Sequence, residues 1–121
     1  VGSYLSVHEG PQRISKGGTV ALQEGMIVSN EPGFYVDGKF GIRIENLQYV
    51  TPAKACKNGR PMMGFEPLTL APIDRHLIDV TQLAGDERDW LNDYHRRVLQ
   101  VIGPQLDSGA ARWLKTACKP L

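Results

Sequence analysis

The sequence predicts an α+β fold in which antiparallel strands come first and helices follow. Apolar, β-rich runs flank Asp37-Gly38, and this pair is a hairpin signal because the turn needs a positive φ that glycine adopts without steric cost. Residues 86–102 instead repeat apolar side chains at helical spacing, and Gly103-Pro104 ends that repeat. A chain of 121 residues is long enough for one domain with a modest core.

Composition narrows the classes of partner. The apolar fraction of 41%, the charged fraction of 22% and the formal net charge of +1 are those of an ordinary globular protein. We therefore expect no nucleic acid and no membrane as partners. The sequence contains no run of about 18 apolar residues, so we expect no membrane-spanning helix. Cys56 and Cys118 lack metal-type spacing and are expected to be free thiols. The start VGSYLSVHEG has neither an initiator methionine nor a signal-peptide pattern, so we expect part of a longer protein.

Alternation and breaker residues divide the first half of the chain. Residues 40–50 form the clearest predicted strand, with Ile42 and Ile44 on one face and Arg43 and Glu45 on the other. Pro32-Gly33 predicts a bulge or kink. The other expected segments are a short strand over 1–8, a buried strand over 26–29, a polar loop over 51–61 with its tip at Asn58-Gly59, an extended piece over 62–70, and a turn followed by an extended piece over 73–80.

Two helices are expected after these strands. In the long one, residues 86–102, Leu91, Tyr94 and Val98 form the apolar stripe, while His95 is expected at the surface. A second, short helix is expected over residues 110–118. The sequence therefore places its chemistry-bearing candidates in the strand region rather than on the helices.

Two carboxylates are the first candidates for a site. Glu31 and Glu45 are equidistant from Gly38, so a hairpin that closes symmetrically about Gly38 places them opposite each other with Cβ atoms about 4.5–5.5 Å apart. Like charges repel there, and a shared divalent cation would reverse the sign of the interaction. The alternative is a pair of solvated surface carboxylates. A two-residue loop would instead pair Glu31 with Ile44 and send the glutamates to opposite faces.

Arg43 and His8 are two further candidates for a functional role. Arg43 is expected to form a salt bridge with Glu31 or Glu45, and clamping a substrate carboxylate is its alternative role. His8 is either a structural hydrogen-bonding group or a catalytic one. The sequence gives less reason to assign a functional role to His76 than to His8. From the residues alone the site stays open between a cation site and a charged surface.

The motifs of this chain resemble a known family. The segments VGSYLSVHEGPQRIS, MIVSNEPGFYVDGKFGIRIENL and FEPLTLAPIDRHLIDV, followed by WLNDYH, closely resemble the C-terminal end of Xaa-Pro aminopeptidases (aminopeptidase P), which are M24 metallopeptidases. The resemblance implies the C-terminal part of a pita-bread fold, as in creatinase and methionine aminopeptidase. It also implies two regions: residues 1–62 as the end of the catalytic domain and residues 63–121 as the C-terminal extension of the larger enzymes.

The resemblance assigns roles to four residues. The family binds two divalent metal ions, usually manganese, through two aspartates, one histidine and two glutamates. Glu31 of NEPG and Glu45 of RIEN match the metal glutamates, His8 matches a histidine that contacts substrate, and Arg43 matches an arginine near the metals. The other three ligands would lie before Val1, so we expect this chain alone to lack a complete site.

The implied activity is that of the intact protein. The resemblance implies a cytoplasmic enzyme that uses metal-activated water to remove the N-terminal residue from peptides with proline second. We expect this chain alone to be inactive, with the missing N-terminal part and a second copy in a homodimer as partners. Two alternatives stay open: a structural or dimerisation module, favoured by the large apolar groups Trp90, Tyr94, Trp113 and Leu114, and a non-catalytic peptide-binding relative.

Overall fold

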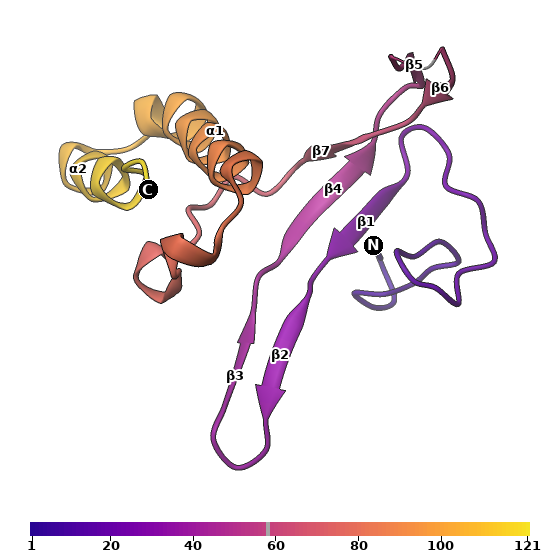
Figure 1. Cartoon of the computed structure of the whole chain (residues 1–121), viewed down its shortest axis with the longest axis horizontal. Helices are drawn as coiled ribbons and strands as arrows, with labels where there is room; N and C mark the ends of the chain where they lie inside the picture. The colour runs from indigo at the N-terminus through magenta and orange to yellow at the C-terminus, as the bar shows by residue number, and fades with distance from the viewer. Residues whose placement is uncertain (58) are drawn as a thin grey trace. The chain divides into compact units, whose positions relative to one another are not determined.

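The computed structural model describes residues 1–57 and 59–121. The chain divides into two compact units, Val1–Thr69 and Leu70–Leu121, and each is described here by itself. Asn58, which the sequence places at the tip of a loop, lies outside the described residues. Within the described part, no helix combines the length and apolarity needed to cross a membrane. Strands occupy the first unit and helices the second, so the predicted α+β order is confirmed (Figure 1).

Antiparallel strands build the first unit. Its main sheet has three strands in the order β1-β4-β7, and two further pairs of strands form the two-stranded ladders β2-β3 and β5-β6. The strands are β1 (Ile27–Asn30), β2 (Gly33–Val36), β3 (Phe40–Arg43), β4 (Asn46–Val50), β5 (Lys54–Ala55), β6 (Pro61–Met62) and β7 (Phe65–Pro67). Val28 of β1 and Val50 of β4 are the buried apolar side chains of this unit.

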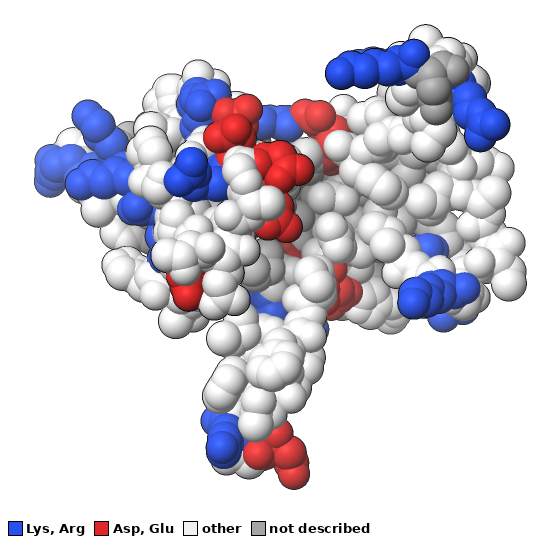
Figure 2. Space-filling model, in the orientation of Figure 1, with Lys and Arg blue, Asp and Glu red and all other residues white. Residues whose placement is uncertain are grey.

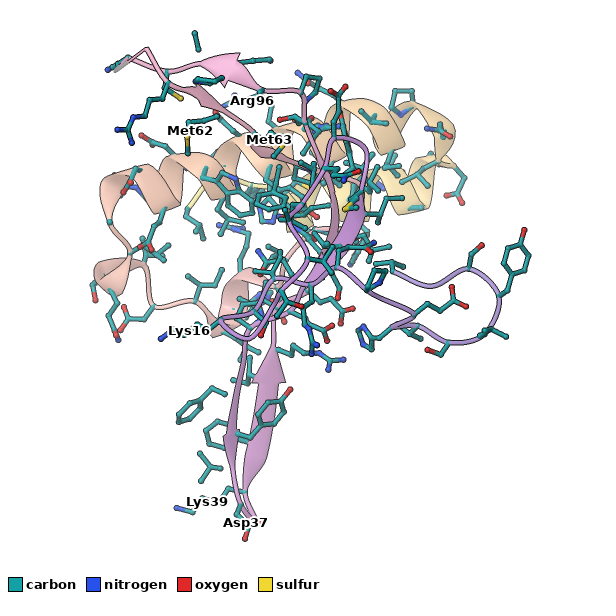
Figure 3. The ribbon with its side chains drawn as sticks, turned by 90° about the vertical axis from the view of Figure 1, so that its right-hand side faces the viewer. Lys16, Asp37, Lys39, Met62, Met63 and Arg96 are labelled. Atoms are coloured by element: carbon teal, nitrogen blue, oxygen red, sulfur yellow. The ribbon has the colours of Figure 1, made fainter. Side chains whose placement is uncertain are left out.

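The hairpin register follows from its turn. Val36 pairs with Phe40, so the loop between β2 and β3 has the odd number of residues that a symmetric hairpin needs. Gly38 lies in that loop with φ of 66°, and the Lys39 N–H donates to the Val36 carbonyl at 3.0 Å. Figure 3 shows the side chains of Asp37 and Lys39 at the end of the hairpin. The predicted turn is confirmed, and the two-residue loop that would separate the glutamates is excluded.

The β2-β3 ladder and the β1-β4 ladder share one register. In both, paired residues are equidistant from Gly38, from Val36 and Phe40 out to Ile27 and Tyr49. Between the ladders the pairing is interrupted, and Pro32 explains this because it has no N–H to donate. Across this point the Ile44 N–H donates to the Pro32 carbonyl at 3.2 Å.

Several expected segments of the first unit are wrong in detail. Residues 40–50 form two strands rather than one, because the ladder breaks opposite Pro32. Residues 1–8 form no strand: the Glu9 carboxylate accepts the N–H groups of Ser3, Tyr4 and Leu5, which therefore cannot pair with a neighbouring strand. The predicted loop over 51–61 contains β5 and the start of β6.

Two long helices and three short 3₁₀ turns make up the second unit. The elements are η1 (Arg75–Leu77), η2 (Val80–Gln82), α1 (Gly85–Ile102), η3 (Gly103–Gln105) and α2 (Ser108–Ala117). The turns η1 and η2 replace the extended piece expected over 73–80. In each, an aspartate carboxylate (Asp74 or Asp79) accepts an N–H two residues on, which favours a capped turn over a strand. Asp107 likewise accepts the N–H groups of Gly109 and Ala110 and starts α2 earlier than expected.

The core of the second unit lies between α1 and α2. The predicted stripe is confirmed, since Leu91, Tyr94 and Val98 are buried and pack with Leu114 and Cys118. The Tyr94 hydroxyl donates to the Ala71 carbonyl at 2.8 Å. Because Tyr94 and Leu114 are used within this core, they are not free for a second subunit. Trp90 and Trp113 remain 49% and 63% exposed.

His95 is buried, so its predicted surface position is wrong. Its side chain is 1% exposed, and Nε2 accepts the Ile73 N–H at 3.1 Å. That bond needs the lone pair on Nε2, so the proton lies on Nδ1, which has no partner among the described residues. Burial, and secondarily the charge of Arg75, lower the pKa of His95 from its usual value of 6.5.

The second unit is expected to lose stability in mild acid. Below about pH 6.5 the unfolded chain protonates His95 while the folded chain does not, so stability falls as the pH drops from 6.5 toward the lowered pKa. Hydrogen exchange of the α1 amides in the intact protein, corrected for intrinsic rates, measures this loss. His95→Gln should remove this part of the pH dependence, whereas His76→Gln, an exposed histidine of η1, should keep it. An unchanged dependence in His95→Gln would contradict the assignment.

Candidate metal centre

The two predicted glutamates lie at the break between the two ladders. Glu31 follows the last residue of β1 and Glu45 precedes the first residue of β4. Because the ladders on both sides pair residues equidistant from Gly38, this register carries Glu31 and Glu45 to opposite positions on neighbouring chain segments. The symmetric placement expected from the sequence is therefore confirmed.

Arg43, the last residue of β3, joins the two carboxylates. Its Nη1 lies 3.2 Å from Oε2 of Glu31, and its Nη2 lies 3.3 Å from Oε2 of Glu45. The predicted salt bridge is confirmed, and it involves both glutamates rather than one. A positive charge between the carboxylates offsets their mutual repulsion, which explains how the pair is tolerated in this chain.

Glu31 is the most enclosed of these side chains. Its side chain is 25% exposed, against 40% for Glu45 and 50% for Arg43. The Ser29 hydroxyl donates to Oε1 of Glu31 at 2.8 Å. The sequence reading missed Ser29, although the period-two rule places residues 29 and 31 on the same side of the strand. Ser29 therefore restrains the carboxylate on the side away from Arg43.

The loop over residues 1–9 brings His8 close to Glu31. Nε2 of His8 lies 3.6 Å from Oε1 of Glu31, and the His8 side chain is 65% exposed. The loop is held by Glu9, whose pKa is lowered mainly by the backbone N–H of Ser3 and next by that of Leu5. All four residues singled out in the sequence thus lie together. Two of the four, His8 and Glu31, line a cavity of about 760 Å³.

These residues fit part of a site for a hard divalent cation. Each glutamate directs one carboxylate oxygen at a single positive group, the Arg43 guanidinium, so the arrangement already converges on a cation. Carboxylate oxygens are also the ligands that Mg²⁺ and Mn²⁺ prefer. Within residues 1–57 and 59–121, however, no group of three or more His, Cys, Asp or Glu side chains is arranged to hold a metal ion. Glu31 and Glu45 would supply two of the four or more ligands that are usual.

The fold and the carboxylate pair indicate a class of protein, and comparison with family models identifies it. The model of metallopeptidase family M24 matches residues 1–52, and that of the C-terminal region of peptidase M24 matches residues 61–121. The chain belongs to the M24 metallopeptidase family, as its motifs led us to expect.

Two curated relatives and one solved structure that the chain matches are named aminopeptidases. The chain is 48% identical to aminopeptidase P2 of Arabidopsis thaliana and 42% identical to Xaa-Pro aminopeptidase 1 of Dictyostelium discoideum, and both matches cover 100% of this chain. It also matches the crystal structure of X-prolyl aminopeptidase from Caenorhabditis elegans, with a TM-score of 0.86 and 39% identity over 100% of this chain. That protein is described as a cytosolic enzyme with a di-nuclear active site. The chain spans only 18%, 20% and 20% of these three proteins, respectively.

Proposed function

We propose that the intact protein is a dinuclear-metal aminopeptidase that removes the N-terminal residue from peptides with proline at the second position. The observation that carries this proposal is the convergence of Glu31 and Glu45, from opposite sides of one hairpin, on a single positive group. Membership of the M24 family and the names of the relatives support the reaction and the substrate class.

Glu31 and Glu45 would hold the metal ions, together with ligands from the part of the protein outside this chain. When bound, two divalent metal ions supply an activated water for attack on the scissile carbonyl. We propose manganese, which matches the oxygen donors of the two glutamates. Because this chain contributes only two ligands, we propose that it does not hold the metals tightly and is inactive alone.

Arg43 and His8 would act beside the metal ligands. Arg43 already contacts both carboxylates, so it would hold their oxygens in one orientation as a positioning residue. His8 lies at the rim of the same cavity, where its imidazole would donate a hydrogen bond to the substrate as charge develops on the carbonyl. The Ser29 hydroxyl would restrict Glu31 further.

Domain organisation and assembly remain parts of the proposal. We propose that residues 1–62 complete the catalytic domain and that residues 63–121 form an extension; the separate matches over 1–52 and 61–121 support this division. We also propose a cytosolic protein, supported by the description of the C. elegans enzyme. The exposed rings of Trp90 and Trp113 favour an apolar contact with a second copy or with the missing part.

Activity and its dependence on metal test the proposed function. The intact protein is expected to release the N-terminal residue from a tripeptide with proline second and not from the same tripeptide with alanine second. Dialysis against a chelator should abolish this activity, and Mn²⁺ should restore it better than Mg²⁺. Binding of the proline peptide without any hydrolysis, in the presence of Mn²⁺, would instead favour the non-catalytic peptide-binding relative.

A further inference from the structure

Arg13 lines the cavity that Glu31 also lines, and it has no role in the proposed chemistry. It lies on the loop that follows His8, and the cavity of about 760 Å³ is lined by both residues and by Glu31. Cavities of roughly 300–1,000 Å³ are typical of sites for small ligands. The first unit therefore places a cation in the same cavity as the predicted metal ligand and the predicted substrate-binding histidine.

The other charged groups that line this cavity are already engaged. The Glu9 carboxylate accepts backbone N–H groups of its own loop, and Glu31 pairs with Arg43. Across the described ranges 1–57 and 59–121, no ion pair or hydrogen bond engages the guanidinium of Arg13. Arg13 is thus the lining cation that remains available for an anionic ligand.

We propose that Arg13 binds the C-terminal carboxylate of short peptide substrates whose N-terminal end lies at Glu31 and His8. This inference rests on the proposed function. A planar guanidinium donates two parallel hydrogen bonds to the two oxygens of a carboxylate. An amide has only one acceptor oxygen and cannot accept both. The segment from His8 to Arg13 spans at most about 18 Å when extended, the length of a peptide of about five residues. A free peptide of no more than about five residues would therefore be long enough to reach from His8 to Arg13.

The test compares a peptide acid with its amide. The intact protein is assayed with one tripeptide that has proline second, as the free acid and as the C-terminal amide. Because Arg13 is exposed, the ion pair is expected to lower KM for the acid about five-fold relative to the amide. The kcat is expected to be equal for both, since the contact is made alike in the bound substrate and in the transition state. Arg13→Ala should raise KM for the acid to that of the amide, and Arg13→Lys should retain part of the difference.

Lys16 provides the matched control. It is a cation of the same loop, labelled in Figure 3, that does not line the cavity. Lys16→Ala should keep the five-fold preference. Equal KM values for acid and amide in the unaltered protein, or an undiminished preference in Arg13→Ala, would overturn the assignment of Arg13. Absence of hydrolysis of both peptides would overturn the proposed function instead; calorimetric binding of the same two peptides then decides the role of Arg13 by the same five-fold criterion.

Discussion

Replacing Glu45 by Gln in the intact protein is expected to lower peptide hydrolysis by at least about 100-fold. The carboxamide keeps the size of the side chain but loses the negative charge that a divalent cation requires. Removal of a group that only orients a metal ligand already costs about 10–100-fold, so loss of a ligand itself should reach at least the upper end of that range. Elemental analysis of the purified variant should show less bound metal per chain than in the unaltered protein.

Glu24→Gln is the control for this substitution. Glu24 is an exposed glutamate of the same unit that lies outside the carboxylate pair, so the same chemical change there should leave activity and metal content unaltered. A Glu45→Gln variant with full metal content and full activity would contradict the role of Glu45. Full metal content with lost activity would instead assign Glu45 a role other than holding the ions.

Leu114→Ala is expected to destabilise the second unit by about 2–5 kcal/mol. Leu114 is 2% exposed and packs against Leu91, Tyr94 and Val98, so shortening it removes apolar contact and leaves a cavity between the helices. The loss should appear in the intact protein as faster hydrogen exchange of the α1 amides, by at least about 30-fold at the lower end of that range.

Leu77 offers a matched substitution on the same unit. It lies in η1 and is 71% exposed, so Leu77→Ala removes the same atoms without opening a cavity. Its effect on α1 exchange should be small, within about 0.5 kcal/mol. If both variants accelerate exchange equally, Leu114 does not belong to the core that holds α1.

The β2-β3 hairpin exposes several large apolar side chains. Phe34, Tyr35, Phe40 and Ile42 are all 42% exposed or more, and Figure 2 shows the hairpin stem white up to its charged tip. The ring of Tyr35 covers Gly33 and Gly41, so part of this apolar surface packs on the hairpin itself. The relatives are about five times as long as this chain, consistent with further chain packing on this ribbon.

Local rules were enough to predict the framework of the site. The glycine turn and the period-two alternation are short-range properties, so they predict the hairpin about Gly38 and limit Glu31 and Glu45 to two registers, of which the three-residue loop of the structure selects the symmetric one. The helical stripe of α1 could be read for the same reason. In both cases the chain's own geometry determines the neighbours.

Only the tertiary structure decided which hydrogen-bond or ion-pair partner each polar side chain has. His95 is buried because the Ile73 N–H, far along the chain, reaches its ring, and residues 1–8 form no strand because Glu9 takes their N–H groups. Arg43 pairs with both glutamates instead of one because the folded hairpin brings both carboxylates within reach of its guanidinium. Hydrogen bonding and burial depend on which distant groups meet, and periodicity along the chain does not carry that information. By itself, therefore, the sequence determined a hairpin centred on Gly38 in which the two carboxylates can face each other. The tertiary structure decided that they do, and that Arg43, Ser29 and His8 lie against them.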